Sequence, residues 1–245
     1  MNILVTNDDG IYSPGLTALA RAAQRMGTVR IVAPDVEQSS MGHAITHSRP
    51  LSYRPTPSLP FDAHRVNGTP ADCVALGCHM WHDVDVVLSG INLGLNLGTS
   101  AWHSGTLAAA KQAALLGVRG IAFSTSTGEH DAEPDFEALA PHVDAVLAFV
   151  LEHRDLTLVN VNLPAKPGPM RWTRQSIRHY DGRVVPIQDP RGRPLYWSTV
   201  APIEAPEEGT DRWAVDHGMI SISPLRLDIT DHALLTAVQR DHPLG

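Results

Sequence analysis

The sequence predicts an α/β protein whose mostly parallel sheet is covered by helices on both faces. Strand and helix patterns alternate over about the first 160 of the 245 residues, and such alternation is typical of parallel sheets. The strand predicted at Val84–Leu88 carries the apolar run Val86-Val87-Leu88, as expected for a buried parallel strand. We therefore expect a Rossmann-like three-layer domain over residues 1–163. A C-terminal hairpin and tail region, residues 164–245, follows as an extension without βαβ units.

Local signals place the individual elements. Residues 2–6 form the first predicted strand, and Ser13-Pro14 supplies the N-cap and first-turn proline of a helix that ends at Gly27. Thr69-Pro70 begins a second helix in the same way. The other expected elements are strands at 29–33, 51–54, 63–66, 84–88, 120–124 and 156–162, and helices at about 70–81, 104–116 and 134–153. Long loops at 34–50 and 89–105 separate them, and loops of this length are often functional.

The region after Pro164 indicates hairpins. Arg171–Tyr180 and Leu195–Val200 are predicted as two long strands joined through residues 189–194. Apolar side chains such as Tyr196 and Trp197 would need covering on a protruding hairpin. Pairing with another subunit and folding back onto the same domain both remain open.

Composition limits the function classes. The formal net charge is -7, which argues against binding of a nucleic acid polymer, because that requires a basic surface. Met1-Asn2 leads directly into the first strand, and no segment is apolar enough to cross a membrane, so we expect a soluble cytoplasmic protein. Cys73 and Cys78 are spaced off a common helix face, which predicts neither a disulfide nor a zinc pair.

Two adjacent carboxylates, Asp8 and Asp9, directly follow the first predicted strand. Adjacent carboxylates repel each other, and a hard cation with oxygen ligands is a common reason to place them together. An isolated Asp-Asp pair is more often an ordinary solvated turn. The loops after the second strand and after Leu88 end at the same sheet edge, where ligands bind in parallel α/β sheets. Polar side chains from all three loops are therefore expected to converge.

The loop that follows Leu88 has glycines at positions 90, 94 and 98 and the amides Asn92 and Asn96. It is not a GxGxxG motif, and it does not follow the first strand, so it gives little support for dinucleotide binding. Ser104-Gly105-Thr106 begins the next helix, where free backbone N–H groups favour an anion such as phosphate. An ordinary N-cap is the alternative. Carboxylates beside an anion site indicate metal-assisted phosphoester hydrolysis, with His43 or His103 as added stabilisers.

The chain resembles the SurE (survival protein E) family of metal-dependent 5'-nucleotidases. The blocks that carry the resemblance occur in family order: 3–11, 13–15, 32–35 with Gln38-Ser39, 67–74, 85–92 with Gly94, Asn96 and Gly98, 104–106 and 160–164. Shorter similarities occur at Gly209-Thr210-Asp211 and after Pro224. The sequence departs from the family pattern at Thr99-Ser100 and His103, which bears on how base and ribose are held.

The resemblance implies a site and an activity. One divalent ion per subunit, Mg²⁺ or Mn²⁺, would be bound by Asp8, Asp9, Ser39 and Asn92, and the substrates would be nucleoside 5'- and also 3'-monophosphates, with short polyphosphate as a further substrate. It implies a homodimer or homotetramer assembled through the C-terminal region. The residues expected at the phosphate are Asn96, Ser104, Gly105, Thr106, Gly42 and His43.

Asp8 and Asp9 are the predicted catalytic residues. Asp8 would hold the metal, activate water or attack phosphorus itself, and the sequence leaves these three roles open. A haloacid-dehalogenase-like phosphatase is an alternative, but that class requires Asp-x-Asp where this chain has Asp-Asp. A non-catalytic nucleotide or phosphate sensor is a second alternative, although a sensor has no need of paired carboxylates. An interaction protein built on the C-terminal hairpin would leave the first 110 or so residues unexplained.

Overall fold

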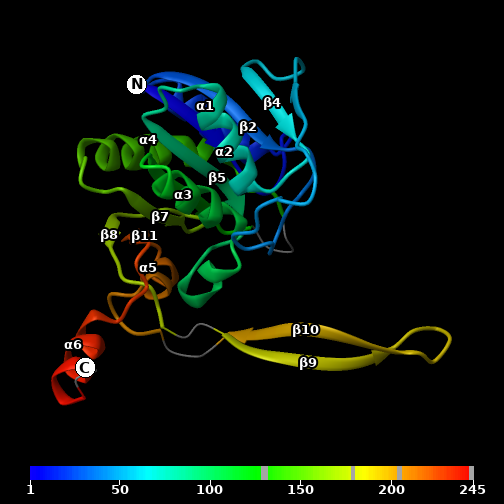
Figure 1. Ribbon diagram of the computed structural model, residues 1–245, viewed down its shortest axis with the longest axis vertical. Coiled ribbons are helices and arrows are strands. Elements are labelled where there is room, and N and C mark those ends of the chain that lie inside the picture. Colours follow the sequence, from blue (N-terminus) through cyan, green and yellow to red (C-terminus); the bar gives the residue numbers. More distant parts are fainter. Residues whose placement is uncertain (128–131, 178–179, 203–205, 243–245) are drawn as a thin grey trace.

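The computed structural model describes residues 1–127, 132–177, 180–202 and 206–242. Within these residues a nine-stranded sheet has the order β3-β4-β2-β1-β5-β6-β7-β11-β8 (Figure 1). The six strands from β4 to β7 in this order run parallel, so the predicted mostly parallel sheet is confirmed. The sheet consists of β1 (Asn2–Thr6), β2 (Thr28–Pro34), β3 (Tyr53–Pro55), β4 (Asp62–Val66), β5 (Val86–Leu93), β6 (Arg119–Thr125), β7 (Leu158–Leu163), β8 (Met170–Trp172) and β11 (Ile220–Pro224).

Helices cover both faces of this sheet and complete the three layers. On one face α1 (Pro14–Ala23) packs against α4 (Phe136–Glu152), and on the other α2 (Pro70–Met80) packs against α3 (Gly105–Leu115). The central strand β1 supplies both cores, because successive side chains of a strand point to opposite faces. Ile3 and Val5 are buried in the larger cluster with α1 and α4, and Leu4 is buried in the cluster with α2 and α3.

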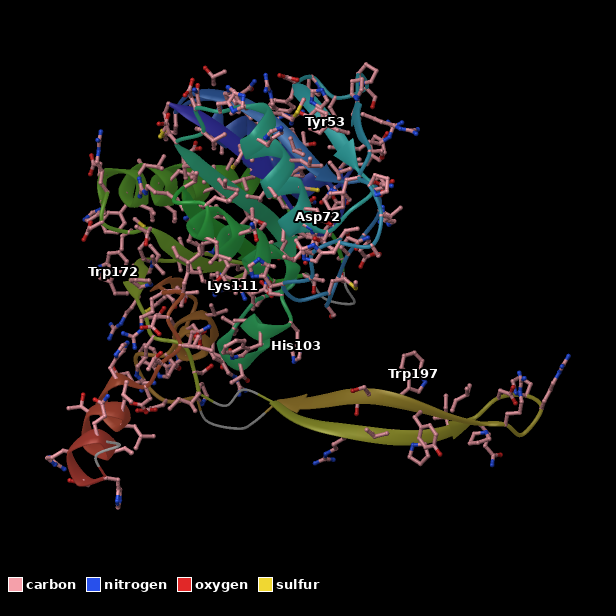
Figure 2. The ribbon with its side chains drawn as sticks, in the orientation of Figure 1. Tyr53, Asp72, His103, Lys111, Trp172 and Trp197 are labelled. Atoms are coloured by element: carbon pink, nitrogen blue, oxygen red, sulfur yellow. The ribbon has the colours of Figure 1, made fainter. Side chains whose placement is uncertain are left out.

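The helices start where predicted, although the Ser13 hydroxyl at the N-cap of α1 makes no capping hydrogen bond. Pro14 opens α1, and Thr69 caps α2 in a reciprocal capping box with Asp72. Asp72, labelled in Figure 2, also accepts hydrogen bonds from the backbone N–H and hydroxyl of Thr46, at 3.0 and 2.6 Å. Burial opposes ionisation of this carboxyl, but the bonds from Thr46 and Thr69 outweigh it and lower the pKa of Asp72. One side chain therefore caps α2 and anchors the long loop that contains Ser39.

The predicted end of β5 at Leu88 was wrong. The strand continues to Leu93, with a register irregularity between Ser89 and Asn92 where it pairs with β6. Gly90 has φ 133° at this point, and a Cβ there would lie 2.2 Å from the Phe123 carbonyl oxygen. Glycine at position 90 thus lets β5 continue irregularly beside β6. The sequence pattern alone had suggested that the residues after Leu88 form a loop.

The C-terminal hairpin forms, but one of its strands was misplaced by the prediction. Its strands are β9 (Tyr180–Gln188) and β10 (Pro194–Pro202), and Gln188 pairs with Pro194 across the turn. The residues just before the turn must form the partner strand of β10. The prediction that residues 171–180 form this strand was therefore wrong. Residues 178–179 lie outside the described residues. β8 instead pairs with β11. The hairpin projects from the domain, and Figure 2 shows Trp197 on it, away from the sheet.

The rest of the C-terminal region is divided between the sheet and the tail. β11 pairs antiparallel with β7, and α5 (Asp211–Asp216) packs on β11, so this part is continuous with the first 163 residues. The tail helix α6 (His232–Asp241) buries none of its residues. The boundary at residue 163 stays a prediction. None of the helices in the described ranges has the length and apolar character needed to span a bilayer.

Candidate metal and phosphate site

The candidate site lies at the point in the sheet where the strand order changes direction, at β1. β1 lies between β2 and β5, so the loops after these three strands meet at their carboxyl ends. The Gln38 backbone N–H donates to the Asp8 carbonyl oxygen at 2.8 Å, which brings the Ser39 loop beside the aspartate pair. The Asp9 carboxylate accepts from the backbone N–H of Leu93, directly after Asn92. The four predicted metal ligands are thus on segments that contact one another.

Asp8 is held at the start of α3. Its side chain is 4% exposed, and the Thr106 hydroxyl donates to Oδ1 at 2.7 Å. Burial raises the pKa of Asp8, while hydrogen bonds from the Thr106 hydroxyl and backbone N–H oppose the rise. A Cβ on Gly105 would lie 2.8 Å from the Asp8 Cβ and Oδ2, so glycine permits this close approach. The anion that the structure places at this helix start is the Asp8 carboxylate.

The surroundings of Asp9 disfavour its charged form. Burial and the neighbouring Asp8 raise the pKa of Asp9 to about 7, and Glu37 acts in the same direction. Its buried Oδ2 has no hydrogen-bond partner among the described residues. Buried charges in proteins are normally paired or bound to metal, so this atom indicates a missing positive partner.

The remaining predicted ligands offer neutral oxygens. Asn92 donates its amide N–H to the Gly94 carbonyl at 2.7 Å, which leaves Oδ1 as an acceptor. Ser39 donates its hydroxyl proton to Glu37 at 2.7 Å, which leaves the oxygen lone pairs. The described residues contain no group of three His, Cys, Asp or Glu side chains that could hold a metal ion. The predicted set consists of two carboxylates, a hydroxyl and an amide. This all-oxygen set fits Mg²⁺ or Mn²⁺.

The predicted phosphate residues do not all come together. Ser104 caps α3 by accepting from the Leu107 N–H at 3.0 Å, and its own proton remains available. Gly42 donates its N–H to the His103 carbonyl at 3.0 Å. The His43 ring lies 2.9 Å from Gln112 Oε1, roughly two helical turns beyond the start of α3. Gly42 therefore borders the site, whereas the ring of His43 is directed farther along the helix.

A group of buried polar side chains around Asn96 was not predicted from the sequence as part of the site. Asn160 and Asn162 on β7 and Ser124 on β6 are each 0% exposed, and all three hydrogen-bond to Asn96. Two asparagines spaced by two on an otherwise apolar strand share one face of it. Because buried polar side chains need partners, that spacing was an available signal.

A family model described as "Survival protein SurE" matches residues 3–182. The chain belongs to the SurE family. The "5'-nucleotidase SurE 1" of Thermus thermophilus is 48% identical, with 97% of this chain and 96% of the relative covered. The "5'-nucleotidase SurE" of Geobacter sulfurreducens is 44% identical, with 98% and 93% covered.

A solved SurE structure confirms the fold. The crystal structure of the SurE protein from Aquifex aeolicus superposes with a TM-score of 0.84 at 38% identity, and the match covers 98% of this chain and 99% of that one. The resemblance inferred from the sequence blocks is thereby confirmed over nearly the full length. Because the chain belongs to the SurE family, the alternative of a haloacid-dehalogenase-like phosphatase is excluded.

Proposed function

We propose that this protein is a metal-dependent 5'-nucleotidase, which hydrolyses nucleoside monophosphates to nucleoside and phosphate. The observation that carries the proposal is the adjacent pair of a buried Asp8, held at the start of α3, and a half-buried Asp9 whose Oδ2 has no partner among the described residues. The relatives named 5'-nucleotidase support it, because they match this chain over nearly its whole length. A passive phosphate sensor would have no use for two mutually repelling carboxylates at its anion site.

The proposed metal ligands are Asp8, Asp9, Ser39 and Asn92, for one Mg²⁺ or Mn²⁺ per subunit. The bound ion would supply Lewis-acid polarisation of a phosphate oxygen and neutralise the two carboxylates. Thr106 fixes the orientation of Asp8, and the Leu93 N–H fixes that of Asp9. The ligands are therefore preorganised by protein groups.

The phosphate is proposed to lie beside the Ser104 hydroxyl, the backbone of Gly105 and Thr106, and Gly42. The helix start and a free hydroxyl favour the added negative charge. Asn96 and His43, also expected at the phosphate from the sequence, have protein partners in this structure. Action on 3'-monophosphates and on short polyphosphate, and the exact role of Asp8, stay predictions.

Phosphate release tests the proposal. Purified protein is incubated with a panel of nucleoside 5'- and 3'-monophosphates and short polyphosphate, each with Mg²⁺, Mn²⁺ or EDTA. We expect release from 5'-monophosphates that EDTA abolishes. Asp8→Asn and Asp9→Asn should each lower the rate on the order of a thousandfold, because a metal-ligand carboxylate is lost.

Circular dichroism serves as the folding control for both variants. Near-wild-type turnover in both folded variants, or turnover that persists in EDTA, would contradict the assignment.

We propose further that the projecting hairpin β9–β10 joins subunits into a homodimer or homotetramer. Tyr196 and Trp197 are 68% and 62% exposed, and Val184 is 68% exposed on the facing strand. A two-stranded hairpin is marginally stable alone, so exposed apolar residues on it favour burial against a partner. A cytoplasmic location stays a prediction.

A further inference from the structure

We propose that the side chains of Asn96 and Thr106 are positioning residues that orient Asp8, and that Asn160 and Asn162 hold Asn96 in place. The inference rests on the proposed nucleotidase site and deepens it. It reassigns two residues that the sequence suggested as phosphate ligands, and it gives a role to two buried asparagines of β7.

The backbone of Asn96 is held by side chains instead of by a neighbouring strand. Asn162 accepts from the Asn96 N–H at 2.8 Å and donates to its carbonyl at 3.2 Å, and Asn160 donates to the same carbonyl at 2.8 Å. Asn96 is 8% exposed, so its backbone groups need these partners. The two amides therefore fix the loop after β5 against the end of β7.

The side chain of Asn96 extends this support to α3. Its amide nitrogen donates to Ser124 Oγ at 2.8 Å and to Thr106 Oγ1 at 3.2 Å. An amide nitrogen carries two protons, so both are used within the protein. Neither proton of the Asn96 amide is left for a substrate phosphate.

The Thr106 hydroxyl acts as donor in one hydrogen bond of this network and as acceptor in another. It donates its single proton to Asp8 Oδ1 at 2.7 Å while its oxygen accepts from Asn96. Thr106 is fully buried, and its hydroxyl proton is therefore committed to the carboxylate. The path Asn162–Asn96–Thr106–Asp8 connects β7 to the proposed metal ligand through four contiguous groups, and its effect is to hold one carboxylate oxygen in place.

The test separates positioning from phosphate binding at Thr106. Thr106→Val removes the hydroxyl with little change in shape, and Thr106→Ser retains it. We expect Thr106→Val to lower kcat about 10- to 100-fold with KM for the nucleotide nearly unchanged, and Thr106→Ser to recover most of the loss. Thr173→Val is the matched control, because Thr173 is also buried and hydroxyl-bonded but contacts Ser221 and Ser223.

A second readout does not depend on turnover. Mn²⁺ binding to the substrate-free protein is measured from the spin-resonance signal of the free ion. Thr106→Val should weaken Mn²⁺ affinity about tenfold, with wild-type affinity in Thr173→Val. A wild-type protein without nucleotidase activity would contradict the proposed function alone, and the Mn²⁺ series would still decide the inference.

Two results would overturn the positioning role. A raised KM with unchanged kcat in Thr106→Val would assign the hydroxyl to substrate binding. Wild-type kcat and wild-type Mn²⁺ affinity in that variant would show that Asp8 needs no support from it.

The anchors are tested by a double-mutant cycle of Asn162→Ala with Thr106→Val. Because both act through one path, the double variant should lose clearly less than the product of the two single losses in Mn²⁺ affinity. Strictly multiplicative losses would contradict the link between β7 and Asp8. If Asn162→Ala fails to fold, the Thr106 series decides the proposal by itself.

Discussion

The carboxyl group of Asp9 is placed where its charge is disfavoured. Its folded pKa of about 7 lies above its ordinary value of 3.8. Below the ordinary value both folded and unfolded chains hold the proton, and no stability is lost. Between the two values only the folded state keeps it, so the free energy of unfolding of the metal-free protein falls as pH rises, and the loss is complete above about 7.

Asp9→Asn should remove this loss. In EDTA at pH 8 we expect the variant to be more stable than wild type by on the order of 1–2 kcal/mol, and the difference should shrink toward pH 4. Urea unfolding at several pH values measures it, with the exposed Asp35→Asn as control. A pH-independent difference would show that Asp9 titrates alike in folded and unfolded chains.

The hairpin β9–β10 projects from the domain and exposes apolar side chains, and the proposed subunit contact is tested there. We expect sedimentation equilibrium to give a dimer or tetramer for the wild type and a smaller species for the Tyr196→Ser, Trp197→Ser double variant, because the exposed apolar surface would be lost. Thr199→Ala on the same strand is the control. Unchanged mass in the double variant, with an unchanged far-ultraviolet spectrum, would place the subunit contact elsewhere.

Elements differed in how well local signals predicted them. α1 and α2 start at Pro14 and Pro70 as expected, since capping acts within one turn and is visible in the sequence. The first hairpin strand was misplaced, and β11 and α6 were not predicted at all. β11 is fixed by antiparallel pairing with β7, about 60 residues earlier, and single-sequence patterns carry little information on such distant pairing.

For the molecule as a whole, metal binding should raise the free energy of unfolding. A divalent ion that binds only the folded state adds about 2.7 kcal/mol when its concentration is a hundred times the Kd. For a chain of this size we expect Mn²⁺ at that concentration to raise Tm by roughly 5–10 °C over EDTA, measured by scanning calorimetry. The shift should vanish in the Asp8→Asn, Asp9→Asn double variant. An equal shift there would mean that the ion binds elsewhere.

The sequence by itself determined the fold class, the family and the segments of the proposed site. These follow from periodicity, capping and short motifs such as Asn7-Asp8-Asp9-Gly10, all of which are local. Only the tertiary structure decided which side chains face each other at the sheet edge. It placed Asp8 against the start of α3, and it connected Asn162 to Asp8 through Asn96 and Thr106. Hydrogen-bond partners that lie 66 or 98 residues apart depend on packing, which no local pattern encodes.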